Sequence, residues 1–249
     1  MSIKIKTNEE IALMRDAGKI VAETHLLLES MIKPGISTFE LDEAARKFIL
    51  KNNAIPSFKD YNGYPGNICT SINEEVVHGI PSKKRILKEG DIISVDIGAY
   101  YKGFHGDAAR THGVGKISEE ARNLIDVTRQ SFFEGLKVIK EGNHLHEISS
   151  AIQNYVEKNG YSVVRDLVGH GVGRDLHEEP QIPNYKTIGR GPKLLKGMVI
   201  AVEPMINIGR YEVRWLSDDW TVVTMDGSLS AHYENTILVT EDGSELLTL

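Results

Sequence analysis

The chain has 249 residues, of which 41% are hydrophobic and 26% charged, a composition typical of a folded globular protein. Its 29 basic and 35 acidic residues give a formal charge of −6, which argues against a general basic surface for nucleic acid or membrane. The single cysteine excludes an internal disulfide, and the sequence has neither a signal-peptide core nor about 20 consecutive apolar residues, so we expect a cytoplasmic protein that does not cross a membrane.

Four helices are expected, in two pairs. Capping-box patterns at Thr7 and Ser37, each with a glutamate three residues later, open the first two helices, which end near residues 33 and 51. The second pair is expected over 118–139 and 145–158, and each of these segments stops at a glycine.

Runs with β-sheet character follow each helix pair. We expect a hairpin over 91–99 and 104–111 with a four-residue turn, and later strands over 198–207 and 230–240 that flank an inserted hairpin at 212–216 and 221–223. Helices followed by strands, twice over, favour the α+β class.

The two halves of the chain resemble each other. A shift of 107 positions superimposes segment 33–52 on 140–159 and segment 87–95 on 194–202, and it places Asp96 on Glu203. A constant offset over two separate segments indicates an internal duplication, with repeats over about 7–112 and 118–249. Because no low-complexity linker divides them, we expect a single domain over 1–249.

Several acidic residues stand in strands that are otherwise apolar. Asp96 and Asp107 would face each other across the expected hairpin, with Cβ atoms about 5 Å apart, and like charges in that position are destabilising without a cation. Glu203 ends the apolar run 198–202, Glu234 lies in another, and His170 sits between glycines. Four carboxylates with one imidazole suit two divalent cations such as Co, Mn, Fe or Zn, whereas exposed or salt-bridged acids are the alternative for any one of them.

These segments carry motifs that resemble those of type I methionine aminopeptidases. The matching stretches are NEEVVHGIP at 73–81, GFHGD at 103–107, GHGVG at 169–173, LHEEP at 176–180, EPM at 203–205 and SAHYE at 230–234. The resemblance runs nearly from end to end and in order. Two positions depart from the family: Asn235 stands where histidine is usual, and Leu176 stands where some members have phenylalanine.

The resemblance implies the duplicated, pseudo-twofold "pita-bread" fold, an antiparallel sheet covered by two helix pairs. It implies metal ligation by Asp96, Asp107, His170, Glu203 and Glu234 and adds His78 and His177 as catalytic histidines. It also suggests a methionine pocket lined by Phe58, Tyr61, Tyr64, Cys69, Leu176 and Trp220.

The expected activity is therefore hydrolysis by a metal-dependent aminopeptidase that removes the initiator methionine and prefers a small second residue. In this hypothesis Glu203 accepts the proton, His177 polarises the carbonyl oxygen and His78 bonds the peptide nitrogen. The expected partner is the N-terminus of a nascent polypeptide, with the ribosome as a further candidate, and the expected oligomeric state is a monomer.

Besides a secondary paralogue of the same enzyme with weaker activity, which the departure at Asn235 leaves open, two alternatives of different function remain at this point. The first is a proline-specific aminopeptidase on the same fold, although such enzymes usually carry a large N-terminal domain and the first helix is expected here by about residue 8. The second is a metal-free protein that only binds peptides, against which all five ligand positions keep chemically competent residues.

Overall fold

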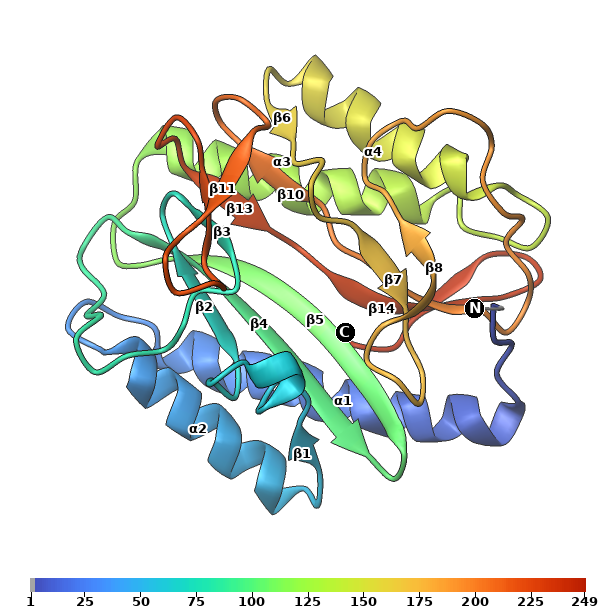
Figure 1. Cartoon of the computed structure of the whole chain (residues 1–249), viewed down its shortest axis with the longest axis horizontal. Coiled ribbons are helices and arrows are strands. Elements are labelled where there is room, and N and C mark those ends of the chain that lie inside the picture. Colours follow the sequence, from blue (N-terminus) through green and yellow to red (C-terminus); the bar gives the residue numbers. More distant parts are fainter. Residues whose placement is uncertain (1–2) are drawn as a thin grey trace.

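The structure is a computed structural model, and it describes residues 3–249; Met1 and Ser2, the start of the hydrophilic N-terminal stretch, lie outside the described residues. Its helices lie in two pairs with the strands between them, one pair along the lower edge of Figure 1 and the other along the upper edge. The helices are α1 (Asn8–Met31), α2 (Thr38–Lys51), α3 (Glu119–Leu136) and α4 (Leu145–Lys158), with a short 3-10 helix, η1, at Tyr61–Gly63.

The expected helix starts are confirmed by their caps. The Thr7 and Ser37 side chains accept bonds from the backbone N–H groups of Glu10 and Glu40, whose carboxylates bond back to the cap residues. Helix α3 ends at Leu136 instead of near residue 139 because the chain tightens there: the Val138 and Ile139 N–H groups bond to carbonyls three residues back, Ile139 to Leu136 at 3.1 Å.

All strand pairs of the described residues are antiparallel, which confirms the α+β class. Each half contributes one larger sheet, and two three-stranded sheets lie beside them. The first larger sheet contains β1 (Ile55–Pro56), β2 (Cys69–Ile72), β4 (Ile92–Tyr101) and β5 (Phe104–Gly113), and the second contains β7 (Gly169–Gly171), β8 (Glu178–Ile182), β9 (Val199–Val202), β14 (Asn235–Val239) and β15 (Ser244–Leu246). The smaller sheets contain β6 (Ser162–Val163), β10 (Met205–Asn207) and β13 (Ser230–His232), and β3 (Glu75–Val77), β11 (Val213–Trp215) and β12 (Val222–Thr224).

The internal duplication is visible in individual hydrogen bonds. The Gly35 N–H donates to the Leu87 carbonyl at 2.8 Å, and the Gly142 N–H donates to the Leu194 carbonyl at 2.9 Å. Two isolated bridges, Ser37 with Ile86 and His144 with Lys193, are related by the same offset in sequence. The two halves therefore share their local hydrogen bonding as well as their order of elements.

Each half packs its own apolar core. One buried cluster combines α1 and α2 with β4, and another combines α3 and α4 with β9 and β14. A third cluster joins the halves, since Met14 of α1 and Phe104 of β5 pack with Val199 and Leu238. Within residues 3–249, no helix combines the length and the apolar character needed to cross a bilayer.

Two long strands expected from the sequence are each divided in two. The 198–207 run breaks at Glu203–Pro204, because proline has no N–H to give to a ladder, and it continues as β10 in another sheet. The 230–240 run breaks at Tyr233–Glu234, where the Glu234 N–H donates to the Ala109 carbonyl of β5 at 3.0 Å. Both breaks place an acidic residue where the two halves meet.

Candidate metal centre and substrate pocket

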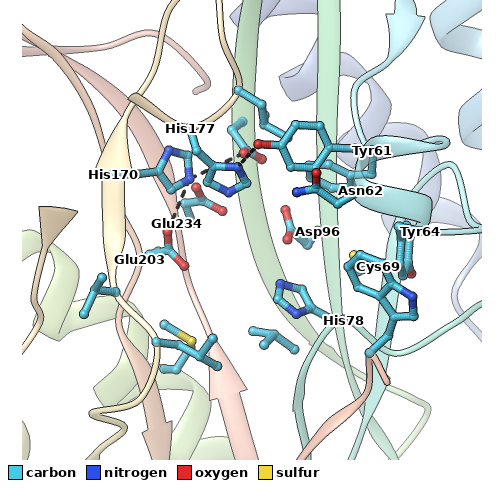
Figure 2. Close-up of a pocket in the computed structure, with 18 residues that line it drawn as sticks. Tyr61, Asn62, Tyr64, Cys69, His78, Asp96, His170, His177, Glu203 and Glu234 are labelled. Atoms are coloured by element: carbon cyan, nitrogen blue, oxygen red, sulfur yellow. Dashed lines mark hydrogen bonds and ion pairs between the residues drawn. The ribbon is translucent and has the colours of Figure 1, made fainter. Parts of the chain in front are cut away.

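Both halves of the molecule contribute acids to one cavity of about 250 Å³. Asp96 of β4 and Asp107 of β5 come from the first half, and Figure 2 shows Glu203, Glu234 and His170 of the second half approaching the same space. The structure therefore brings together all five groups that the sequence singled out as metal ligands.

The hairpin register expected from the sequence is wrong by two residues. Tyr101 pairs with Phe104 across a two-residue turn, so Asp107 lies opposite Gly98 and Asp96 lies opposite Ala109. Lys102 and Gly103 both have positive φ, at 46° and 95°, as a tight turn between twisted strands requires. Because side chains alternate with a period of two, this shift leaves both aspartates on one face, as diagonal neighbours.

Three of the five groups already lie close enough to share an ion. Ligand atoms of Asp107, His170 and Glu234 lie within 4.8 Å of one another. The His170 Nε2 atom is 4.0 Å from Asp107 Oδ2 and 3.6 Å from Glu203 Oε1. Because the Gly171 carbonyl can only accept a hydrogen bond, the His170 Nδ1 atom 2.9 Å away carries the proton, and the Nε2 lone pair faces the acids. This tautomer is the one that binds a cation through Nε2.

All four acids have raised pKa values, as expected for buried carboxylates without a compensating positive charge. Burial raises the pKa of Asp96 to about 7, and burial together with neighbouring carboxylates raises the pKa values of Asp107 and Glu234 well above their ordinary values. Burial also raises the pKa of Glu203 well above its ordinary value, and the Asp96 charge adds to the shift.

Buried oxygens of three of these acids have no hydrogen-bond partner, namely Asp96 Oδ1, Asp107 Oδ1 and Glu234 Oε1. A buried, unpaired oxygen is costly unless a cation satisfies it. The donor set and these unpaired atoms therefore fit divalent metal ions.

The two histidines assigned as catalytic border the same cavity. The His177 ring lies 4.2 Å from the His170 ring, and its Nδ1 atom lies 2.7 Å from the Tyr61 hydroxyl. His78 follows β3 with a φ of 60°, a conformation that costs energy outside glycine and often marks functional sites. Burial lowers the pKa of His78 to about 4 and also lowers the pKa of His177, so both rings are neutral at pH 7.

An apolar slot opens beside the acids. Phe58, Tyr64, Cys69 and Leu176 form a buried cluster against which Tyr61 and Trp220 pack, so all six residues expected to line a pocket do line the cavity. Cys69 lies directly opposite Asp96 in the β2–β4 ladder, which brings the slot to the acids. Burial raises the pKa of the Cys69 thiol well above its usual range, so it acts as apolar lining and is no nucleophile.

Sequence reasoning missed other residues that line the cavity. These are Asn62, Val77, Leu167, Val168 and Met205. Met205 stands two residues after Glu203, so the alternation of side chains along the expected strand was a usable signal for it. Val77 directly precedes His78, and alternation would place these two side chains on opposite faces, so it gave no signal for Val77. Leu167, Val168 and Asn62 lie outside the strands and had no comparable signal.

A hydrogen-bond network fixes the backbone of two of the acids, Asp107 and Glu234. The Thr236 hydroxyl donates to the Asp107 carbonyl at 2.8 Å and accepts from the Asp107 N–H at 3.0 Å. Arg110 donates to the Glu234 carbonyl and, at 2.6 Å, to Oδ1 of Asn235, which also accepts from Thr248. Asn235, which departs from the family pattern, is thus a buried acceptor that supports Glu234, and it is not one of the residues that line the cavity.

A buried group of acids with one imidazole lone pair, beside an apolar slot, is characteristic of a hydrolytic metal centre that binds a side chain next to the bond it cleaves. The family model for metallopeptidase family M24 matches residues 12–241, and the chain belongs to this family. Family membership and the Asp107–His170–Glu234 group together support the use of a divalent metal ion.

Known proteins similar to this chain match it over its whole length. A methionine aminopeptidase from Clostridium acetobutylicum is 60% identical over 247 residues, which cover 99% of each chain. The crystal structure of a methionine aminopeptidase from Thermotoga maritima has a TM-score of 0.97 and 48% identity, with 99% of each chain covered. A prolidase from Pyrococcus furiosus is more distant, with a TM-score of 0.77 and 26% identity over 98% of this chain but 65% of its own. These neighbours confirm the duplicated pita-bread fold.

Proposed function

We propose that the protein is a methionine aminopeptidase that removes the initiator methionine from new polypeptides. The observation that carries the proposal is the apolar slot of Phe58, Tyr64, Cys69 and Leu176, which opens directly onto the acid cluster. An unbranched thioether side chain suits such a lining. The names of the full-length relatives from Clostridium acetobutylicum and Thermotoga maritima support the same activity.

The proposed cofactor is a pair of divalent ions, Co, Mn, Fe or Zn. Asp96, Asp107, His170, Glu203 and Glu234 would hold them, since four carboxylates carry about the charge that two such ions offset. The unpaired oxygens of three of these acids and the lone pair of His170 support this ligand set. When bound, divalent ions act as Lewis acids that polarise a carbonyl and make water more acidic.

The proposed roles of the protein side chains follow from where they lie. Glu203 accepts a proton from the attacking water, because its carboxylate lies at the edge of the acid cluster with 13% of its side chain exposed. His177 donates a hydrogen bond to the carbonyl oxygen, where negative charge develops, while the Tyr61 hydroxyl orients its ring. His78, on the opposite wall of the cavity in Figure 2, bonds the peptide nitrogen.

Further parts of the proposal concern the context of the enzyme. A small second residue is preferred, and the nascent polypeptide is the partner, met in the cytoplasm and near the ribosome. The chain acts as a monomer and as one catalytic domain over 1–249, which is supported by the fact that the acids of a single cavity come from both halves.

The experiment is a comparison of peptides and metals. Chelated protein should be inactive, and adding back one of the four ions should restore cleavage of Met-Ala-Ser but give no cleavage of Ala-Pro-Ala. Asp107→Asn should abolish the activity, whereas Asp16→Asn, at an exposed position of α1, should leave it unchanged. Preferential cleavage of Ala-Pro-Ala would support the proline-specific alternative, and a protein that binds no metal would support the peptide-binding one.

A further inference from the structure

A buried ion pair lies outside the proposed catalytic machinery, beside the wall of the cavity. The Lys6 Nζ atom is 2.6 Å from Glu178 Oε2, and the two side chains are only 5% and 2% exposed. Lys4 reaches the other carboxylate oxygen of Glu178 at 3.3 Å, but its side chain is 45% exposed. Two buried charges are costly to bring out of water, so a pair at this position calls for an explanation.

The Glu178 carboxylate holds the loop that precedes it. Its Oε1 atom accepts backbone bonds from the Arg174 N–H at 3.0 Å and from the Asp175 N–H at 3.4 Å. Gly173 leaves the room that this arrangement needs, because a Cβ atom there would lie 2.5 Å from Glu178 Oε1 and 2.6 Å from Lys6 Cε. The loop therefore folds around one carboxylate.

The same loop carries two residues of the active site. Leu176, which is 2% exposed, lines the apolar slot, and His177 follows it directly. The two backbone bonds that the Glu178 carboxylate accepts end one residue before Leu176, and Glu178 directly follows His177, so both side chains lie in the short stretch between the bonded amides and Glu178 itself.

Lys6 is itself anchored to the second half of the molecule. Its backbone N–H donates to the Gly197 carbonyl at 2.9 Å, two residues before β9 begins. Its ammonium also donates to the Lys4 carbonyl at 3.4 Å. The segment Lys4–Lys6 that precedes α1 is thus held in place by the second half, and it positions the Lys6 ammonium against the Glu178 carboxylate.

We propose that Lys6 and Glu178 are positioning residues that set the placement of Leu176 and His177, and with it the selectivity for the first side chain of the substrate. This inference rests on the proposed aminopeptidase function for its kinetic consequences, but the geometry of the loop can be tested without it. A misplacement of about 1 Å at a reacting group can lower a rate by about 100-fold, so a loosened loop has a measurable effect.

The test compares three variants. Lys6→Met removes the cation and keeps most of the chain length, Lys4→Met removes the exposed lysine of the same cluster, and the double variant Lys6→Met with Glu178→Gln removes both buried charges. The side-chain amide oxygen introduced by Glu178→Gln can still accept the two backbone bonds, so the double variant restores a neutral, bonded loop. Each protein is assayed with Met-Ala-Ser and Leu-Ala-Ser, and its bound Co²⁺ is measured.

For Lys6→Met, we expect a loss of about tenfold or more in kcat/KM for Met-Ala-Ser, with a smaller preference over Leu-Ala-Ser and unchanged Co²⁺ content. Lys4→Met should change kcat/KM by about twofold at most, because exposed ion pairs contribute little. The double variant should recover most of the activity and selectivity lost by Lys6→Met. Equal kinetics of Lys6→Met and wild type, unchanged selectivity in Lys6→Met, or a double variant no better than Lys6→Met would overturn the proposal.

Hydrogen exchange separates this inference from the proposed function. The Arg174 and Asp175 amides should exchange about tenfold faster or more in Lys6→Met than in wild type, and the double variant should bring them back toward wild type. This measurement stands even if wild type does not cleave Met-Ala-Ser. Exchange in Lys6→Met equal to that in wild type would refute the positioning role whatever the peptide assays give.

Discussion

Asp96→Asn should stabilise the metal-free protein at alkaline pH, because the wild-type carboxylate is buried among other acids. Burial raises the pKa of Asp96 from 3.8 to about 7 in the folded protein. Because the folded-state pKa of Asp96 lies above the unfolded value, the protonated group costs no stability below pH 3.8. The free energy of unfolding then falls as the pH rises through the folded-state pKa of about 7. A shift of this size corresponds to a loss of about 4 kcal/mol above pH 7 in the absence of metal.

The assay is urea unfolding of chelated wild type and chelated Asp96→Asn at pH 5 and pH 8. At pH 8 the variant should be more stable by up to about 4 kcal/mol, or roughly 10 °C in melting temperature for a chain of this size. At pH 5 less than half of this stability difference should remain, because the wild-type carboxyl group is then almost entirely protonated in the folded protein. Asp16→Asn, at an exposed position, serves as the control and should show neither effect.

With saturating Co²⁺, wild type should become more stable than Asp96→Asn. The ion binds the folded wild type and stabilises it by mass action, whereas the variant has lost one of its proposed ligands. A metal-free Asp96→Asn that is less stable than wild type at pH 8, or equally stable, would refute the view that burial of the ionised Asp96 carboxylate without a metal ion costs stability.

Three further predictions address the pocket and its support. Gly98→Ala should lower kcat/KM for Met-Ala-Ser by about tenfold, because its Cβ would lie 2.8 Å from Phe58 Cε1 and must displace that ring; unchanged peptide kinetics would contradict this. Leu176→Ala should raise KM for Met-Ala-Ser by a factor that corresponds to about 1–3 kcal/mol, with melting temperature as the control for folding. Thr248→Val should weaken Co²⁺ binding measured by calorimetry about tenfold, because Asn235 loses a donor behind Glu234, and an unaltered affinity would show that this support is dispensable.

The sequence predicts most of the fold because its signals are local. Helix starts at Thr7 and Ser37 follow from capping boxes whose two bonds both form in the structure. The duplication is readable because related positions need the same residue type in both halves: Gly35 and Gly142 both have a positive φ, at 93° and 89°, which favours glycine.

The hairpin register predicted from the sequence is wrong because that prediction places Tyr100 and Tyr101 in the turn. Tyrosine favours strands, so the shorter Lys102–Gly103 turn was the better choice on propensity alone. The error did not affect the site, because a shift of two residues keeps Asp96 and Asp107 on the same face. The face on which each aspartate lies therefore depends on whether the register shift is odd or even, and not on which residue stands directly opposite.

The sequence does not predict which residues far apart in the chain contact each other. The pairing of Lys6 with Glu178 and the bond of Arg110 to Asn235 link residues far apart in the chain, and neither shows a periodicity or a motif. The breaks at Glu203–Pro204 and Tyr233–Glu234 depend on which sheet each strand segment joins. Such choices are set by the packing of the two halves against each other.

The proposed metal centre is tested most directly by a calorimetric titration of the metal-free protein with Co²⁺, repeated on five single alanine variants at Asp96, Asp107, His170, Glu203 and Glu234. If these five residues hold two metal ions, wild type binds two Co²⁺ ions per chain, and every variant binds them more weakly or not at all. Wild-type affinity and stoichiometry in all five variants, or a folded wild type that binds no Co²⁺, would contradict the proposed metal centre.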